Sequence, residues 1–510
     1  MTKPIRGSLF GFGRKPKKPR RDPDNLNSRQ YITVQELISE GEIEGWATAE
    51  RERKAALDAD ANAEGWGRGE VNYNTAALKD VFLDNTPVLH KDAVSTAPEG
   101  KHINYPDVTF TPRFGTANQT HVSGIESTAK DVSFTSHTAV TTTQSVSSTI
   151  NLGIPIPDSD LNIGADAARV TIQFPQLFET NDKGDLLGRS VEIKITLEYT
   201  DKNNNTAGEK DYLTDTISGR TNDAYQRAYR VDFTQESLGI AIDEGSVIVK
   251  VKRITQDNSS NEKIKDIFTV TKIQALEDDH SSYPDSAYGV LTLDSKVVSS
   301  VPSRKYRIRG IKIRIPGAGA SNSGTPTVDS ETGRIVYPTN YIFNGTMGAA
   351  QWCTCPSMVL LDLLTSIRYG LGEQIAPDYD PDNPLDSDLF ANIDLYSFVE
   401  ASKYSNTLVS DGFGSTEPRF SCNVNILSAK EAFNLIEELS GVMRCMPIWA
   451  AGRITISQDK PTDASFLFSL ANVTEEGFSY SGSSLKTRHS AVSVSYYNMD
   501  SREIDFELVE

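Results

Sequence analysis

The feature that most constrains this fold is a long region, about 76–315, built of short runs in which apolar and polar residues alternate. Runs such as 191–199 and 247–254 place Val and Ile at every second position, between charged residues. An alternation with a period of two is typical of strands that bury one face. Turn residues such as Asn203 separate the runs at the spacing of a β-sandwich. The sequence therefore predicts a mainly β fold with α+β parts.

At 510 residues the chain is too long for one hydrophobic core, so three or four domains are expected. Composition and pattern changes divide it as follows: 1–27, a basic disordered arm; 28–160, the first part of a discontinuous barrel-like domain, with a surface insertion at 47–75; 161–284, an inserted β-sandwich; 285–350, the second part of the barrel; 351–460, an α/β domain; and 461–510, a C-terminal β segment of a second barrel.

Helical patterns are confined to a few places. Apolar residues at helical spacing predict helices at 358–367, 392–408 and 428–440. The last of these is preceded by a capping box of Ser428 and Glu431. A similar box at 33–36 predicts a short helix near the start of the barrel-like domain.

Charge is distributed unevenly along the chain. The whole sequence carries 51 basic and 69 acidic residues, yet all eight charged residues among the first 21 are basic. An acidic body disfavours nucleic-acid binding, which needs an excess of Lys and Arg, and no sequence-specific binding of that kind is expected. The basic arm is read as a nucleic-acid arm or as an arm that docks on an acidic protein surface. The second reading is favoured, because no aromatic stacking platform accompanies the charges.

The sequence has no run of 18 apolar residues and no signal-peptide pattern, so assembly in the cytoplasm is expected. The four cysteines allow disulfides or a metal site, but they lack any C-x-x-C pair: Cys353, Cys355, Cys422 and Cys445. An acidic loop at 378–388 has D-x-D-x-D spacing, although Asn383 and Leu389 depart from the calcium-loop pattern. No metal and no cofactor are assigned.

Enzyme motifs are absent from the sequence. None of the six histidines lies in a metalloprotease or nucleophile-elbow motif. Asp411 and Glu417 resemble a glycosidase carboxylate pair, but their place in a turn beside Arg419 favours a structural ion pair. Gly412 and Gly414 form only G-x-G, which does not indicate nucleotide binding. The sequence predicts no catalytic residue.

Several phrases of sequence, in one order along the chain, carry a resemblance to a known family. The strongest are DGFGSTEPRFSCN at 411–423 and MRCMPIW at 443–449. The others are ISEGEIEG, VFLDNTPVL, RKYRIRG, AQWC, LLTSIRYGLG, LKTRHSAVSVSYYN and ELVE. Together they resemble the N-terminal hub portion of the tail-tip attachment protein J family of lambda-like phages.

The resemblance implies a structural role at the virion tail tip. It implies that the barrel-like and α/β parts are hub domains, that the chain is a homotrimer, and that its partners are hexameric distal-tail or tail-tip ring proteins and the tape-measure protein. The hub would close the tail tube and open for DNA ejection, and it would meet the host surface only indirectly or through a further C-terminal part. No catalytic residue or cofactor is implied.

The family-motif positions are expected to be structural or interface residues: Trp352, Arg368, Tyr369, Gly370, Gly372, Asp411, Gly412, Gly414, Glu417, Arg419, Cys422, Met443, Arg444, Cys445, Pro447 and Trp449. Aromatic and arginine side chains at such positions serve either as interface anchors or as core residues, and the sequence leaves both open. The alternative function is a glycan-binding or glycan-cleaving β-sandwich protein. The lack of any tryptophan in 161–284 counts against it.

Overall fold

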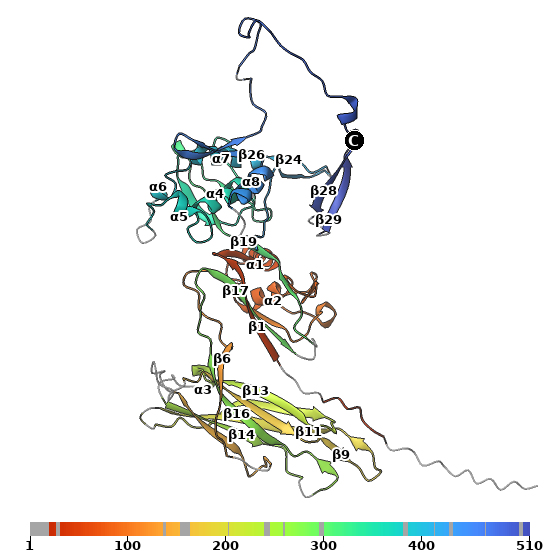
Figure 1. The fold of residues 1–510 in the computed structure, drawn as a ribbon. Helices are drawn as coiled ribbons and strands as arrows, with labels where there is room; N and C mark the ends of the chain where they lie inside the picture. The colour runs from red at the N-terminus through yellow and green to blue at the C-terminus, as the bar shows by residue number, and fades with distance from the viewer. Residues whose placement is uncertain are drawn as a thin grey trace, which may run out of the picture. The chain divides into compact units, whose positions relative to one another are not determined.

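A computed structural model describes residues 20–26, 31–135, 139–152, 164–201, 203, 205–238, 245–258, 261–294, 300–380, 386–412, 414–427, 432–464, 466–498 and 503–509. The chain is mainly β, as predicted (Figure 1). It divides into two compact units, Met1–Ser457 and Gln458–Glu510. Among the described residues no helix is long and apolar enough to cross a membrane.

The first β domain is formed by two stretches of the chain, one that precedes the sandwich in the sequence and one that follows it. Strand β1 (Tyr31–Glu40) pairs antiparallel with β17 (Ser286–Asp294), which also pairs with β5 (Thr109–Phe114). Two further small sheets complete it: β18 (Arg304–Tyr306), β3 (Val81–Leu83) and β4 (Thr86–Pro87), and β19 (Ile308–Ile311) with β2 (Ile43–Trp46). The domain therefore consists of three small sheets rather than one closed barrel.

The helix predicted from the capping box at 33–36 is wrong, because these residues lie within β1. Thr33 faces Thr292 and Val34 faces Leu291 across the ladder with β17. The local S/T-x-x-E signal stabilises one helix end, whereas the ladder satisfies main-chain groups along the whole strand. Tertiary pairing thus overrides the local pattern.

The segment 47–75 was predicted to be a surface insertion, but this is wrong for its two ends, which form helices that pack into the domain core. Helices α1 (Ala47–Ala59) and α2 (Val71–Ala77) bring Ala49 and Tyr73 into the domain core, where both are fully buried. Glu50 is buried beside them and accepts hydrogen bonds from the Tyr73 hydroxyl at 2.9 Å and from Arg68 Nε at 2.7 Å. The buried carboxylate is therefore paired, as burial of a charge requires.

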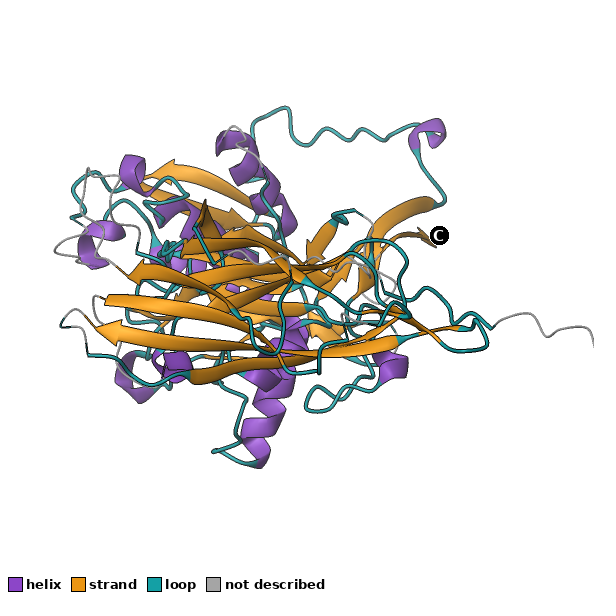
Figure 2. Cartoon of the chain, turned by 90° about the horizontal axis from the view of Figure 1, so that it is seen from below, coloured by secondary structure: helices purple, strands orange, loops and turns teal. Residues whose placement is uncertain are grey.

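Residues 126–278 hold a two-sheet β-sandwich, and its long strands are prominent in Figure 2. One sheet has the order β12 (Lys210–Gly219), β11 (Arg189–Asp201), β14 (Gly245–Arg253), β7 (Val146–Leu152). The other has the order β13 (Tyr225–Asp232), β8 (Ala167–Phe174), β16 (Thr269–Asp278), β6 (Glu126–Asp131). A small sheet accompanies them: β10 (Leu186–Leu187), β9 (Phe178–Thr180) and β15 (Ile264–Lys265).

The sandwich begins earlier than residue 161, where the sequence analysis placed its start. Strands β6 and β7 lie in the Ser/Thr-rich stretch that was expected to form loops or an arm. In β7 the buried positions alternate, with Val146, Ile150 and Leu152 entering the core. The outward positions hold Ser147, Thr149 and Asn151, but the inward position 148 holds a buried serine, which interrupts the pattern of period two.

The end of the basic arm is docked on the sandwich of the same chain. Within the described residues 20–26, Asp22 N donates to Leu186 O at 3.0 Å, and Arg220 Nε donates to Asp22 O at 2.6 Å. Leu26 packs against the sandwich core. The predicted disorder of 1–27 is therefore wrong for these seven residues, and residues 1–19 lie outside the described part of the chain.

The α/β domain is built around three helices, α4 (Pro356–Thr365), α7 (Leu395–Ser405) and α8 (Ala432–Val442). Its strands are β20 (Ile313–Pro316) with β23 (Met347–Gln351), β21 (Thr327–Val328) with β22 (Ile335–Val336), β24 (Leu408–Ser410) with β25 (Thr416–Pro418), and β26 (Cys445–Ala450) with β27 (Arg453–Gln458). The short helices of this domain are η2 (Ala320–Asn322), α5 (Gly372–Ile375) and α6 (Asp386–Leu389). Two more lie elsewhere: α3 (Gln235–Leu238) in the sandwich and η1 (Gly100–His102) in the first β domain.

Helix α4 ends in a tight corner that carries four of the motif residues. Leu371 N donates to the Leu363 carbonyl at 2.8 Å, so the chain crosses directly over the last turn of the helix. A Cβ at Gly370 would overlap the carbonyl oxygen of Leu363, and one at Gly372 would overlap that of Thr365. Both glycines are needed because the two backbone segments lie too close for a side chain.

The remaining two motif residues anchor this corner by polar contacts. The Tyr369 hydroxyl donates to Asp362 Oδ2 at 2.7 Å. Arg368 forms ion pairs with Glu40 at 2.7 Å and Asp285 at 3.2 Å, which lie at the ends of β1 and before β17. Arg368 therefore has ion-pair partners within the chain, and its expected role as a core or interface residue stays a prediction.

Replacing Gly370 by Ala is expected to lower the free energy of unfolding by about 2–4 kcal/mol, because the new methyl group must push the corner away from α4. Thermal or denaturant unfolding measures the change. Gly441→Ala is the matched control, since a Cβ at Gly441 in α8 meets nothing within 4 Å. Equal effects of the two substitutions would contradict the steric account.

Burial raises the pKa of Asp362 to about 6 from its ordinary value of 3.8, while the hydrogen bond from Tyr369 opposes the rise. The folded state therefore binds the proton more tightly than the unfolded state. The stability that this provides is present below about pH 4 and is lost as the pH rises to about 6, by about 3 kcal/mol. In Asp362→Asn this loss should be absent.

Denaturant unfolding of both proteins at intervals between pH 4 and pH 7 measures the difference. The variant should gain stability relative to the parent protein as the pH rises. Asp58→Asn, at an exposed position on α1, controls for the loss of any one carboxylate. Parallel pH profiles of Asp362→Asn and the parent protein would show that Asp362 is not the group responsible.

Candidate assembly interface

Large apolar side chains lie in water on one part of the α/β domain. Leu427 is 86% exposed, Phe433 on α8 is 73% exposed and Trp449 on β26 is 67% exposed. Their neighbours Val424, Ile426, Val442, Met446 and Ile448 are also exposed. We call these eight residues the apolar face. Exposed apolar side chains concentrated in one stretch of the chain, 424–449, mark a candidate interaction surface.

Helix α8 has apolar residues on more than one side. Leu439 is buried in the domain core, and Leu435 and Ile436 pack against that core from partly buried positions. Phe433 and Val442 point elsewhere and remain exposed. The predicted helix at 428–440 is therefore present, with its described part displaced toward residue 442. The capping residues Ser428 and Glu431 lie outside the described residues.

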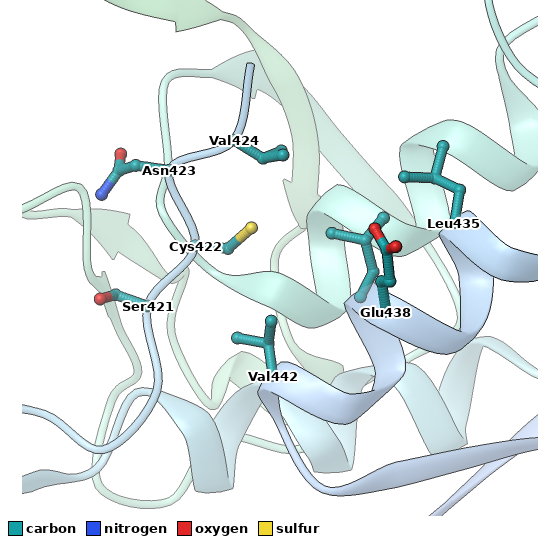
Figure 3. Close-up of a pocket in the computed structure, with 8 residues that line it drawn as sticks. Ser421, Cys422, Asn423, Val424, Leu435, Glu438 and Val442 are labelled. Atoms are coloured by element: carbon teal, nitrogen blue, oxygen red, sulfur yellow. The ribbon is translucent and has the colours of Figure 1, made fainter. Parts of the chain in front are cut away.

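A cavity of about 310 Å³ lies between α8 and the preceding extended segment (Figure 3). Cys422 and Val424 project from the segment, while Leu435, Glu438 and Val442 project from the helix. The lining is mostly apolar, with one carboxylate. This shape suits an inserted apolar side chain better than a charged ligand.

Burial disfavours the reactive thiolate form of three cysteines in this domain, because it raises the pKa of Cys353, Cys355 and Cys422. Cys355 donates to Ser402 Oγ at 3.2 Å. A thiol that stays protonated is a poor nucleophile and a poor metal ligand. Over the part of the chain that the structure describes, no three His, Cys, Asp or Glu residues group as a metal site.

The glycine-rich turn is where the sequence predicted it, between β24 and β25. Gly412 and Gly414 have φ values of 80° and 98°, and Asp411 Oδ1 accepts a hydrogen bond from Ser415 N at 2.9 Å. The ion pair expected between Glu417 and Arg419 is not formed by these two described side chains. Arg419 instead lies over the ring of Tyr404, 4.5 Å from its centroid.

The motif at 443–449 is divided between core and surface. Met443 is fully buried, and Cys445 and Pro447 are half-buried. Arg444 has a φ of 52° and lies 5.6 Å from the ring centroid of Phe420. Trp449 is exposed on the apolar face. Trp352 is half-buried, and the guanidinium carbon of Arg309 lies 4.7 Å from the centroid of its ring.

A second hollow, on the sandwich, is polar. It is lined by Tyr212, Lys210 and Arg230 among others. Arg230 forms ion pairs with Asp278 at 2.7 Å and with Asp232 at 2.7 Å, so its positive charge is already neutralised by partners within the chain. In the acidic loop at 378–388, to which no metal was assigned, residues 381–385 lie outside the described residues.

The unit Gln458–Glu510 is exposed along most of its described length. Its elements are η3 (Leu485–Thr487) and a ribbon of two antiparallel strands, β28 (Val492–Asn498) and β29 (Glu503–Val509). Phe506, Leu508 and Ile504 are each more than 60% exposed. None of these three residues is among the predicted motif positions, although Leu508 lies in the ELVE phrase and the alternating apolar and acidic residues at 503–509 are a detectable signal.

Comparison with known proteins connects these features to one family. Residues 140–279 match the FNIII-A domain of tip attachment protein J. Over 97% of its length the chain is 27% identical to tip attachment protein J of Escherichia phage SECphi27, of which it covers 34%. It is also 27% identical to the same protein of Escherichia phage SECphi4, with 96% of this chain and 36% of that protein covered. The chain thus spans about a third of the length of these relatives.

Solved structures resemble the chain only weakly. The CBM22-2 xylan-binding domain of Paenibacillus barcinonensis Xyn10C is 13% identical, covers 32% of this chain and 94% of its own, and has a TM-score of 0.15. The C-terminal family 22 carbohydrate binding module of Clostridium thermocellum Xyn10B is 14% identical, with 33% and 96% covered and a TM-score of 0.15. Scores this low carry no argument about ligands.

The sequence similarity extends over nearly the whole chain and includes the domain match in the sandwich. The chain is therefore a homologue of the phage tip attachment protein J family, as its sequence motifs predicted.

Proposed function

We propose that this chain is a structural component of a phage tail tip, the central hub that closes the tail tube of a long non-contractile tail. The observation that carries the proposal is the apolar face on the α/β domain. A chain that worked alone would leave Leu427, Phe433 and Trp449 in water. A subunit of an assembly buries such side chains against a neighbour.

The free energy available from this face is sufficient for association. Burying one large apolar side chain stabilises by about 1.5–3 kcal/mol. Covering most of the eight residues of the apolar face would therefore yield on the order of 10–20 kcal/mol. Association costs about 4–15 kcal/mol in lost freedom of the partners, so several of these residues must be covered together. A stable complex needs most of the face.

The assembly we propose is a homotrimer. In a ring of three subunits, the apolar face of each chain must meet a different surface of the next subunit. Such head-to-tail contacts close into a ring when the rotation allows it. In this proposal three chains, each with two hub domains, present a roughly sixfold ring to hexameric distal-tail or tail-tip proteins. The same ring would contact the tape-measure protein and open when DNA is ejected.

The proposed place of action is the tail tip of the virion, after assembly in the host cytoplasm. Contact with the host surface would be indirect or would require a further C-terminal part, because the relatives are about three times as long as the matching region. The role requires no catalytic residue and no cofactor. It requires interfaces, a stable sandwich and a lumen that subunits can close.

The solution mass of the full chain, measured by light scattering and followed by symmetry classification of particle images, tests the proposal. We expect about 168 kDa, three times the 56.0 kDa of one chain, with threefold averages. Phe433→Asp with Trp449→Asp should convert the complex to monomers, because two charges would enter the buried interface.

The matched control is Val71→Asp. Val71 is 70% exposed at the first position of α2, outside the apolar face, where a carboxylate suits a helix N-terminus. That variant should keep the trimer mass. A parent protein that stays at 56 kDa at all accessible concentrations would overturn self-association through this face.

A further inference from the structure

The hairpin of β26 and β27 has one strand edge covered and one at the rim. On the β27 side, Ile454 N donates to Asn392 O at 2.8 Å, and Asp394 N donates to Ile454 O at 2.9 Å. On the other side, β26 is the outer strand of its two-stranded sheet among the described residues. Met446 and Trp449 on β26 are 66% and 67% exposed. A strand at a sheet edge is a template for a strand from elsewhere.

The ribbon of β28 and β29 has apolar side chains on both of its faces. Cross-strand partners point to one side of a ribbon, so Phe506 shares a face with Ser495, and Leu508 shares it with Ser493. Val492 and Val509 face each other on the opposite side. All four of the apolar residues are more than half exposed. A two-stranded ribbon is marginally stable in water unless a further strand or a core supports it.

The two hairpins carry opposite charges. Residues 443–457 include Arg444 and Arg453 and no acidic residue. Residues 503–509 include Glu503, Asp505 and Glu507 and no basic residue. Charges of opposite sign across a pairing edge favour the contact and disfavour pairing of either hairpin with itself.

We propose that the β28–β29 ribbon of one copy adds to the edge of β26 in a second copy and forms a four-stranded sheet across the subunit boundary. The ribbon also covers Trp449 of that copy. This inference rests on the self-association in the proposed function and identifies the segment that performs it. Main-chain hydrogen bonds supply affinity in such strand addition, and side-chain pockets supply specificity.

A second copy fits this contact better than a foreign protein. One chain carries both halves, so a single repeated contact covers the ribbon and the hairpin of every subunit. The connection between them, about 30 residues, can extend up to about 100 Å and can therefore reach a neighbour. Because the two halves differ, the contact is head-to-tail and is satisfied completely only when the subunits form a closed ring.

Complementation between two defective variants tests the proposal directly. Ile448→Glu with Trp449→Glu disables the hairpin, and Phe506→Lys with Leu508→Lys disables the ribbon. All four side chains are exposed, so the substitutions spare the hydrophobic cores. Each variant alone should sediment as a monomer. An equimolar mixture should form a dimer of about 112 kDa, twice 56.0 kDa, because only one intact contact is available.

The control variant is Leu467→Lys, which changes an 81% exposed residue of the same unit outside the ribbon and should leave the trimer intact. A milder test exchanges charges, with Arg453→Glu and Glu507→Lys. Each alone should weaken association by about two- to five-fold, and a chain carrying both should recover it. This pair keeps every apolar contact in place.

The outcomes separate this inference from the proposed function. If the ribbon variant, Phe506→Lys with Leu508→Lys, still forms trimers, the strand-addition contact is wrong while the hub proposal stands. If the hairpin variant also forms trimers, association through the apolar face is contradicted as well, because Ile448 and Trp449 belong to that face. Failure of the mixture to form a dimer also overturns the contact. A parent protein that never associates overturns both proposals.

Discussion

The burial of apolar surface is the constraint on which the rest of this structure depends, and it is met unevenly. The sandwich encloses Phe174, Phe268 and Val249 between two complete sheets, and the first β domain encloses Trp46 and Tyr73. The α/β domain encloses Met358 and Phe398 but leaves its apolar face in water. This exposed part of the domain is where we propose that the chain meets other molecules.

The scaffold of the α/β domain is closely packed at the end of α4. The corner after α4 allows no side chain at Gly370, and Tyr369 fixes it to Asp362. Arg368 ties the same corner to Glu40 at the end of β1. Polar contacts that are satisfied inside the chain hold the scaffold, while the association surface is apolar. Scaffold and interface therefore use different interactions, which lets the interface be changed without unfolding the scaffold.

Much of this architecture could be predicted from the sequence, since period-two patterns such as 191–199 survive in the sandwich strands. The start of the sandwich was missed because Ser148 occupies a buried position of β7 and because β6 is exposed along its whole length. The capping-box signal at 33–36 failed because pairing with β17 outweighs a local pattern. For the site, the sequence motifs led to Trp449 and Cys422, but exposure of Phe433 and Phe506 depends on tertiary packing and is not visible in a sequence.

Hydrogen exchange of the full chain, measured at concentrations below and above association, tests the central claim most directly. The account predicts that amides of α8, β26 and β29 become protected as the concentration rises, while those of β11 and β14 in the sandwich stay constant. Protection that is the same at every concentration in all of these elements would contradict it, because the apolar face would then have no partner in its own assembly.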